Sequence, residues 1–473
     1  MPSAIKRKDA SVARRAYAFV KEALADNEQD LTTGPLNRAL GLLAIPMMLE
    51  MSMEAIFAIV DITFVSRLGT ESVAAVGITE ALITVLYAVA IGLGMGATAM
   101  VSRRIGAGDP HAAALATGQA IWLGIGLSLV IGIAGASQAE ALLNMMGAAP
   151  DVIAAGAGFT RMLLAGSGSI LFLFLITAAF RGAGDASIAL RALVLANAIN
   201  IVLDPCLIFG VGPFPELGVT GAAVATTIGR STGVLYLCWH LFSDRGRLRM
   251  NLSHLVIVPS LIGRLVRISI GGVGQFLIAT SSWIAIMRIV ALYGSAPVAA
   301  YTIAIRVIEF AFLPAWGLGN AAATLVGQNL GAGLPDRAAA TTWKAAKYNT
   351  VFMSALGLML VAFAPIIVGW FSADPEILHY GAACLRILGI GYPAYAIGMI
   401  LVQALNGAGD TYRPTLINFV CFWMTQIPLA YYLAQSRGLG PEGVFIAIVV
   451  SETLLTLIAV FVFRAGAWRN QDA

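Results

Sequence analysis

Charge is scarce in this sequence. Only 11% of the 473 residues are Asp, Glu, Lys or Arg, whereas 59% are hydrophobic. Because soluble domains carry about 25% charged residues, this composition excludes an ordinary soluble protein and indicates one that is embedded in a membrane. The net charge is only +4, so the balance of charges does not point to a nucleic-acid partner.

Cysteine is rare, and the common catalytic motifs are missing. The four cysteines lie inside apolar stretches without metal-ligand spacing, so we expect small buried side chains and no disulfides. The chain contains no Walker A or HExxH motif. Neither ATP-driven pumping nor a common hydrolytic site is therefore indicated, and no cofactor is expected.

Long apolar stretches make up most of the chain. Twelve of them are long enough to cross a bilayer, and helices are the expected form because a span in lipid must satisfy its own backbone hydrogen bonds. The predicted fold is an all-α membrane protein with twelve transmembrane helices. The expected domains are a polar, basic tail (1–35), an N-lobe (36–243, helices 1–6), an inter-lobe loop (244–261), a C-lobe (262–465, helices 7–12) and a C-terminal tail (466–473).

The basic residues predict how the chain is oriented. Most of the 29 lysines and arginines lie in the N-terminal tail and in every second loop, whereas the opposite loops hold only Arg67 and Arg437. By the positive-inside rule, both termini and the inter-lobe loop should be cytoplasmic. We therefore expect a multi-pass protein of the inner (plasma) membrane.

The chain repeats itself at an offset of 225 residues. The Gly-Ala-Gly sequence at 106–108 recurs at 331–333, and the Gly-Ala-Gly-Asp sequence at 182–185 recurs at 407–410. Each repeat contains six predicted spans, an even number, so the two copies have the same orientation in the membrane. The sequence thus predicts two six-helix lobes related by a parallel internal repeat, as in one class of transporters.

The first span, Leu40–Gly69, carries three carboxylates. A helix turns by about 100° per residue, so Glu50, Glu54 and Asp61 fall on one face. Acids in hydrocarbon are costly, and we expect these to point into a bundle or a wet cavity and to mark a transport pathway. Interhelical polar contacts are the alternative. Pro46 is the expected hinge of this span, because proline removes one backbone hydrogen bond.

The fifth span carries a second polar cluster, formed by Asn197, Asn200 and Asp204 on one helical face. The equivalent positions in the second repeat, including that of Asp61, hold no carboxylate or carboxamide and are Ile286, Phe422, Thr425 and Leu429. The cluster therefore belongs to the N-terminal half alone. Asp61 and Asp204 lie at similar depth, so the four polar residues are expected to bind a coupling ion, either a shared proton or Na⁺ held by Asp61, Asn200 and Asp204. A structural hydrogen-bonded cluster is the alternative.

A substrate cavity is expected along the acidic face. Its candidate residues are polar, aromatic or adaptable side chains from several spans: Glu50, Met51, Glu54, Glu80, Gln275, Glu309, Tyr392 and Tyr395. Plainer interpretations remain open. Glu309 can pair with Arg306, Glu80 can reach the interface, the tyrosines can serve packing, and the methionine can fill the core. Because the acids share one cavity face, the cavity should prefer cations to anions.

Four motifs, taken in this order, resemble the bacterial type of the multidrug and toxic compound extrusion (MATE) family of secondary transporters. They are Pro46 followed by Asp61 in Val-Asp-Ile-Thr, Asn200-x-x-x-Asp204-Pro205, Arg-Gly-Ala-Gly-Asp at 181–185, and Val-Gly-Gln-Asn-Leu-Gly-Ala-Gly at 326–333. The resemblance covers roughly Leu36 to Phe463. It implies two lobes around a central cleft that exchange Na⁺ or H⁺ inward for organic cations outward. It also implies that Asp61, Asn200 and Asp204 form a cation site in the N-lobe.

The sequence therefore predicts a transporter and not an enzyme. The expected function is antiport, in which amphipathic, cationic drugs or toxic compounds leave by alternating access, from a monomer surrounded by membrane lipids. A lipid-linked saccharide flippase of the same superfamily is the first alternative, although such a protein should line its cavity with Arg or Lys. A membrane-embedded hydrolase is less favoured, because the GxGD sequences at 182–185 and 407–410 have no partner Tyr-Asp sequence.

Overall fold

The computed structural model describes residues 14–15, 17–25, 30–243 and 246–471. Within these ranges, a few side chains lie outside the description, namely those of Ala58, Ile59, Asp61, Ile62 and Ser66. The described residues are almost wholly helical and include no β-strand. The predicted all-α fold class is confirmed.

The N-terminal half consists of α2 (Leu36–Val65), α3 (Thr70–Gly106), α4 (Pro110–Ser137), α5 (Ala139–Met145), α6 (Pro150–Ala165), α7 (Ser167–Ala183), α8 (Ala186–Phe209) and α9 (Val219–Leu241). The C-terminal half consists of α10 (Pro259–Val290), α11 (Ser295–Gly331), α12 (Pro335–Gly369), α13 (Pro375–Gly407), α14 (Tyr412–Asn418), α15 (Ile427–Tyr431) and α16 (Gly440–Ala465). Two π-helical stretches, Phe419–Gln426 and Tyr432–Ser436, join α14, α15 and the turn before α16 into one rod.

Prolines set the start of several helices at equivalent places in the two halves. Pro110 begins α4 and Pro335 begins α12, while Pro150 begins α6 and Pro375 begins α13. Proline suits the first helical position because its missing N–H has no partner there and its φ is already helical. The 225-residue repeat of the sequence is thus a repeat of helix boundaries as well.

A helical segment occupies the position of every predicted span. Among the described residues, ten helices are long and apolar enough to cross a membrane, and the pair α6–α7, bent by 42°, raises this number to eleven. The remaining segment, α9, has the length of a span but is less apolar than the others. Near the centre of the chain, α10 begins at Pro259, inside the range expected as the inter-lobe loop.

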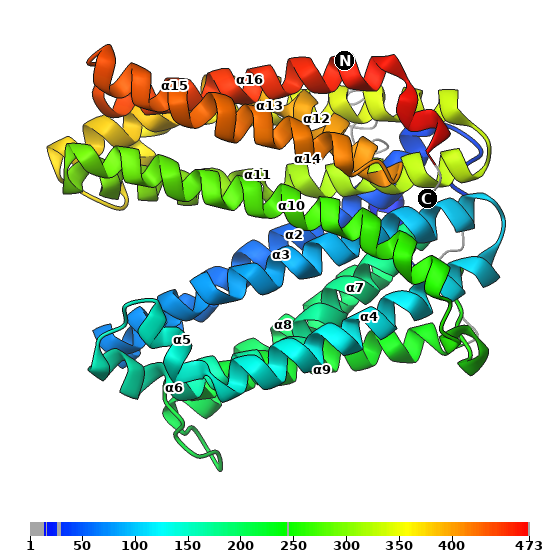
Figure 1. Cartoon of the computed structure of the whole chain (residues 1–473), viewed down its shortest axis with the longest axis horizontal. Helices are drawn as coiled ribbons and strands as arrows, with labels where there is room; N and C mark the ends of the chain where they lie inside the picture. The colour runs from blue at the N-terminus through cyan, green and yellow to red at the C-terminus, as the bar shows by residue number, and fades with distance from the viewer. Residues whose placement is uncertain (1–13, 16, 26–29, 244–245, 472–473) are drawn as a thin grey trace, which may run out of the picture.

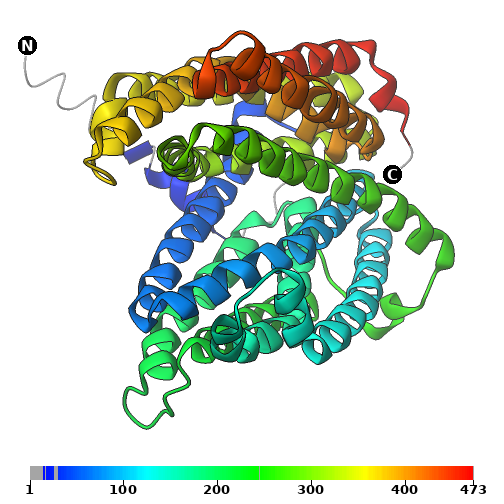
Figure 2. The ribbon, with the colours of Figure 1, turned by 60° about the vertical axis from the view of Figure 1, so that its left-hand side comes forward.

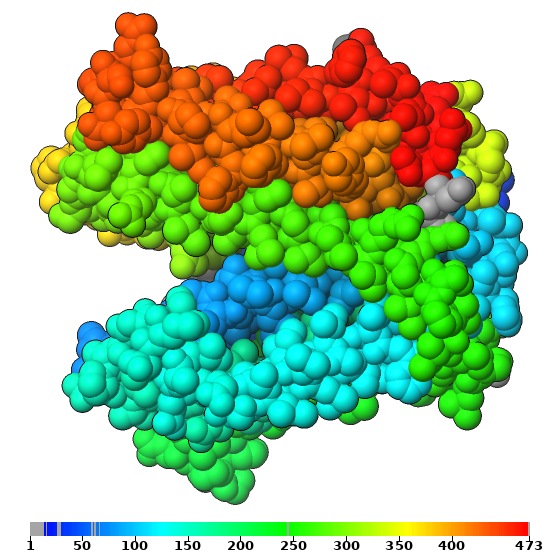
Figure 3. All heavy atoms as spheres, in the orientation of Figure 1, coloured from blue at the N-terminus to red at the C-terminus, as the bar shows by residue number. Residues whose placement is uncertain are grey.

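The two halves form two helical layers that meet at one end and diverge at the other (Figure 1). The view in Figure 2, turned by 60°, shows the same two layers. Each half has its own apolar core, with Phe180 fully buried in the first and Phe445 in the second. The space-filling view shows a cleft between the halves, open at the left and closed toward the right (Figure 3).

Glycines permit the close approach at the closed end. A Cβ atom at Gly106, the last residue of α3, would lie 1.9 Å from the carbonyl oxygen of Gln328 in α11. A Cβ atom at Gly331, the last residue of α11, would lie 1.9 Å from the carbonyl oxygen of Arg103 in α3. Because no larger residue fits either position, the two helices are in backbone contact where the halves meet.

The segment before α2 packs onto this closed end. Leu31 is 4% exposed and Ala23 is 5% exposed, in an apolar cluster with residues of α2, α11 and α12. Arg337 of α12 donates to the backbone carbonyls of Thr33 and Gly34, both at 3.0 Å. Residues of the expected polar tail are therefore held against the membrane-embedded part of the protein.

Candidate transport cavity and coupling-ion site

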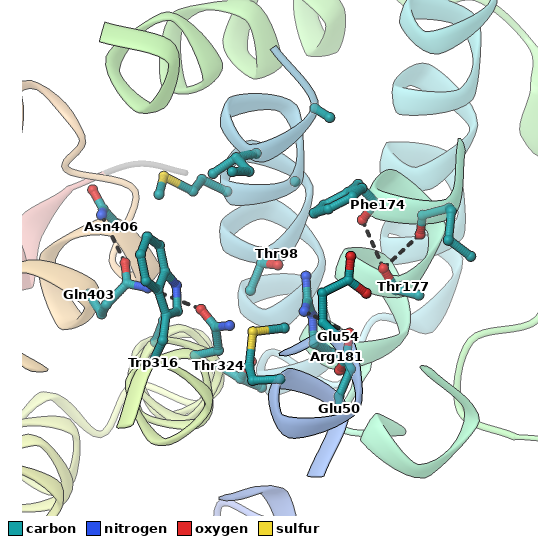
Figure 4. A pocket seen from close by; sticks show the side chains of 18 of the residues that line it. Glu50, Glu54, Thr98, Phe174, Thr177, Arg181, Trp316, Thr324, Gln403 and Asn406 are labelled. Carbon is teal, nitrogen blue, oxygen red and sulfur yellow. Dashed lines mark hydrogen bonds and ion pairs between the residues drawn. The ribbon is translucent and has the colours of Figure 1, made fainter. Parts of the chain in front are cut away.

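A cavity of about 310 Å³ lies between the halves, and side chains from both halves line it (Figure 4). Much of its wall is apolar, and its large apolar side chains include Met51, Met95, Phe174, Phe276, Leu313 and Trp316. Three of the residues predicted for the substrate cavity, Glu50, Met51 and Glu54, belong to this lining. A mostly apolar cavity with a few polar groups is typical of sites that bind small organic molecules.

The N-terminal half contributes an ion pair to the cavity. Nη1 of Arg181, in the last turn of α7, lies 3.1 Å from Oε1 of Glu50 in α2. The two side chains are 13% and 5% exposed, so little water screens them. Among the described atoms, the second carboxylate oxygen of Glu50 has no hydrogen-bond partner.

A second acid and a second arginine face the same cavity. Arg230 of α9 donates a 2.8 Å hydrogen bond to the hydroxyl of Tyr87, and its guanidinium lies 5.8 Å from the centre of that ring. Glu54 lies one helical turn after Glu50 and near Arg230, and it forms no hydrogen bond or ion pair with the described residues. The charges on this side of the cavity are thus two of each sign, whereas the sequence predicted an acidic face.

The C-terminal half contributes a neutral network. Gln275 and Asn406 donate to each other's carbonyl oxygens at 2.9 and 3.0 Å. Asn406 also donates to Gln403 at 3.2 Å, and Gln403 donates to Asn320 at 3.0 Å. Of these four, Gln275 stands behind the lining and the other three belong to it. Gln275 and Asn406 occupy the positions that correspond to Glu50 and Arg181 in the repeat.

The polar cluster of the fifth span is buried in the N-terminal half, away from this cavity. Asp204 is 0% exposed, Asn200 is 2% and Asn197 is 5%. The Asn200 amide lies between Asp204 Oδ1, at 3.3 Å, and the hydroxyl of Thr226 in α9, at 3.1 Å. The amide nitrogen of Asn197 has no hydrogen-bond partner among the described atoms. Asp61 lies in α2, and its side chain is outside the described part of the structure.

Other predicted cavity residues do not line the cavity. Glu80 is exposed on α3. Glu309 is half-buried on α11, and the described contacts include no ion pair between it and Arg306. Tyr392 is 5% exposed in the core of the C-terminal half, and Tyr395 packs edge-on against Phe312 at 6.3 Å. Both aromatic side chains pack within the apolar core of the C-terminal half.

The sequence did not indicate that Arg181 faces the cavity. Its place beside Gly-Ala-Gly-Asp suggested a cytoplasmic loop residue, yet it lies inside α7 and pairs with Glu50, 131 residues away. The 225-residue offset contained a usable signal. It relates Glu50 to Gln275 and Arg181 to Asn406. The two residues that carry opposite charges in the first half are therefore both replaced by neutral residues in the second half.

Two repeated helical halves that enclose a central cavity are the architecture of one class of membrane transporters. A family model described as MatE matches residues 46–206 and again 273–432. The chain therefore belongs to the MATE family, whose members are transporters, and a hydrolase is excluded.

The chain is similar over almost its whole length to other members of the family. It is 26% identical to the probable multidrug resistance protein NorM of Thermotoga maritima, over 91% of this chain and 92% of that one. It is also 26% identical to an FAD transporter of Shewanella oneidensis, over 91% and 95%. A solved outward-facing conformation of a multidrug resistance MATE transporter has a TM-score of 0.87 and 26% identity, over 93% and 98% of the chains. Multidrug efflux transport is thereby supported.

Proposed function

We propose that this protein is an inner-membrane antiporter that exports amphipathic organic cations in exchange for Na⁺ or H⁺. The observation that carries the proposal is the mostly apolar cavity between the halves, which Glu54 lines without a hydrogen bond or ion pair to the described residues. Glu50 and Arg181 largely neutralise each other. Glu54 is then the acid best placed to attract a positive group on an amphipathic compound.

The coupling ion is proposed to bind in the N-terminal half, at Asp204, Asn200, Asn197 and Asp61. Three of these are buried polar side chains, with oxygen atoms that suit Na⁺ and a carboxylate that can accept a proton. Moreover, α2 carries both Glu54 of the cavity and Asp61 of the proposed ion site. A change of charge at the ion site can therefore reach the cavity through a single helix.

Alternating access is proposed to begin from the conformation described above. If the basic loops are cytoplasmic, both termini are also cytoplasmic and the cleft opens outward. Ion binding would favour repacking of α2 against α8, with Pro46 as the hinge, because proline leaves one backbone carbonyl without its helical partner. α2 continues through Pro46 as a single helix, so the residue can act as a hinge without a break in the span.

A second candidate is transport of amphipathic compounds that carry phosphate. Arg181 and Arg230 both line the cavity, and a guanidinium recognises phosphate through paired hydrogen bonds. This observation favours the flippase-like alternative more than the sequence alone does. For Arg181 to bind a substrate phosphate, the phosphate would have to displace Glu50 from its ion pair with Arg181.

Transport by the purified protein in liposomes tests both candidates. A fluorescent amphipathic cation is loaded, and its efflux is followed under a Na⁺ gradient alone and under a proton gradient alone. We expect one gradient to accelerate efflux of the cation, and a phosphate-bearing dye of similar size to move more slowly. An efflux rate that neither gradient changes would contradict antiport. Faster movement of the phosphate-bearing dye than of the cation would favour the second candidate.

A further inference from the structure

The carboxamides of the C-terminal half form one hydrogen-bonded chain that ends at the transport cavity. Its inner end is Gln275, whose amide nitrogen donates to the backbone carbonyl of Thr411 at 3.3 Å as well as to Asn406. Because a backbone carbonyl can only accept a hydrogen bond, this contact fixes which atom of the Gln275 amide is the nitrogen. The direction of every later hydrogen bond in the chain follows from this anchor.

The chain runs outward from this anchor to Asn320. The carbonyl oxygen of Asn406 accepts from Gln275 at 2.9 Å, so the amide nitrogen of Asn406 is the atom that donates to Gln403 at 3.2 Å. Gln403 accepts that bond with its carbonyl oxygen, and its nitrogen donates to the carbonyl oxygen of Asn320 at 3.0 Å. The amide nitrogen of Asn320 is thereby left as the outer end of the chain, and it donates to none of the described residues.

The outer end of the chain is also its accessible end. Gln275, Gln403 and Asn406 are buried, each at most 6% exposed. Asn320 is half-buried and lines the transport cavity. A donor that has no partner in an apolar cavity costs free energy, and a ligand that accepts its hydrogen bond removes that cost. The Asn320 amide is therefore an unused donor at the cavity wall.

An aromatic ring lies one helical turn before Asn320 on α11. Trp316 lines the same cavity, and its ring centre is 5.9 Å from that of Phe312, which packs in turn against Tyr395 at 6.3 Å. Residues four apart share one face of a helix, so Trp316 and Asn320 face the cavity together. This wall thus combines a supported aromatic surface with a neutral hydrogen-bond donor.

The N-terminal half has no such donor at the equivalent positions. Trp316, Asn320 and Gln403 correspond, at the offset of 225 residues, to three apolar residues, Ile91, Met95 and Ala178. In Figure 4, Trp316 and Gln403 lie on one side of the cavity, whereas Glu54 lies on the other. Charge and neutral hydrogen bonding are therefore offered from different sides of the cavity.

We propose that Asn320 binds a carbonyl oxygen of the transported compound, while Trp316 contacts the adjoining aromatic ring. This inference rests on the proposed export of organic cations and names the kind of cation, an aromatic compound with a carbonyl group apart from its positive charge. A ligand carbonyl extends the chain of hydrogen bonds that starts at Thr411. A compound with no acceptor leaves the Asn320 amide unpaired when it displaces water from that amide.

The test compares two aromatic cations of equal charge and similar shape, an N-methylquinolinium with an acetyl group and the same ion with an isopropenyl group. Each displaces a bound fluorescent cation from the purified full chain, and the ratio of the two half-displacing concentrations is measured. Because the isopropenyl compound is the more apolar of the two, the ratio in the wild type is compared with the ratio in variants. If neither compound displaces the fluorescent cation from the wild type, both the acceptor site and the proposed export of cations are wrong.

Two variants change the end of the chain in different ways. Asn320→Leu removes the donor and should shift the ratio about fivefold toward the isopropenyl compound, the loss of one net hydrogen bond. Gln403→Glu keeps the shape of the side chain but accepts where Gln403 donates. The Asn320 amide should then turn its nitrogen to the carboxylate and its oxygen to the cavity, and the ratio should shift in the same direction. The added charge acts on both cations alike and cancels in the ratio.

Thr177→Val is the control for the loss of a polar group from the cavity lining. The hydroxyl of Thr177 already donates to the carbonyl of Leu173 at 2.7 Å, so its removal should leave the ratio unchanged. If the ratio is unchanged in both Asn320→Leu and Gln403→Glu, Asn320 does not bind the carbonyl, although the proposed export of cations still stands. An equal shift of the ratio in Thr177→Val would likewise overturn the assignment to Asn320.

Discussion

At equivalent positions of the repeat, the N-terminal half pairs Glu50 with Arg181 and the C-terminal half pairs Gln275 with Asn406. Both pairs join equivalent helices of their halves, α2 with α7 and α10 with α13. Glu50, Arg181 and Asn406 line the transport cavity, and Gln275 stands behind its lining. In the C-terminal half, the neutral pair connects α10 and α13 through two hydrogen bonds. A charged pair is therefore not required to hold this architecture together.

The same contrast extends to the fifth span of each half. Asn200 and Asp204 are buried in the N-terminal half, whereas Thr425 and Leu429 stand at the equivalent positions. The comparison teaches that, at these positions, the repeat supplies the scaffold twice and the charged side chains once. We infer that the N-terminal half responds to the ion, while the C-terminal half serves mainly as its neutral counterpart across the cavity.

The largest effect is expected from Asp204→Asn. The variant keeps the shape of the side chain but cannot take up the coupling ion, so gradient-driven efflux should fall by at least about tenfold while the protein still reaches the membrane. Leu429→Met, at the equivalent position of the other half, is the matched control and should transport normally. If Asp204→Asn transports at the wild-type rate in liposomes, the proposed functional difference between the two halves is wrong.

Exchanging one pair for the other tests the contrast at the cavity wall. Glu50→Gln alone leaves Arg181 without its acid and should cost about 3 kcal/mol of stability, read from thermal unfolding of the purified protein. Glu50→Gln combined with Arg181→Asn recreates the pair of the C-terminal half and should recover most of that loss. If the double variant is less stable than Glu50→Gln, the two halves are not interchangeable at this crossing.

Glu54→Gln should change selectivity more than stability. Because Glu54 faces the cavity without a direct partner among the described residues, its neutralisation should weaken export of a cationic dye about tenfold and spare a neutral dye of similar size. The equivalent residue of the C-terminal half is Ala279, which brings no charge. An equal loss of export for both dyes would mean that Glu54 has a structural role and does not recognise the charge of the substrate.

The smallest effect is expected at the segment before α2, which packs onto the closed end of the protein. Arg337→Ala removes the hydrogen bonds to Thr33 and Gly34 and should weaken docking of the segment by about 1 kcal/mol. Tryptic cleavage within this segment should then become about five times faster. Lys344→Gln is the control on the same helix, and an unchanged cleavage rate in Arg337→Ala would show that other contacts hold the segment.

Much of the fold could be predicted from the sequence. The spans are recognised from the length of continuous apolar stretches, and the two halves are recognised from motifs that recur at a constant offset of 225 residues. Pro110 and Pro335, for example, begin equivalent helices as the repeat requires. Docking of the first segment was not predicted. Its composition is polar and mixed in charge, and the anchors Ala23 and Leu31 are too few to produce a recognisable apolar pattern.

The candidate site could be predicted only in part. The helical spacing of Glu50 and Glu54 correctly indicated a shared direction, and both face the cavity. The partner Arg181 comes from a helix far along the chain, and spacing within one span carries no information about it. Tyr392 and Tyr395 show the opposite limit. In a helix enclosed by protein, aromatic side chains that pack and those that line a cavity follow the same pattern.

The most direct measurement is the affinity for a fluorescent cationic drug, with and without the coupling ion, in the wild type and in Asp204→Asn. If ion binding in the N-terminal half reshapes the cavity, the ion should lower the wild-type affinity for the drug, and the drug should lower the affinity for the ion by the same factor. In Asp204→Asn the drug affinity should no longer respond to the ion. A wild-type affinity that is unaffected by the ion, or a variant that still responds fully, would contradict a switch in the N-terminal half.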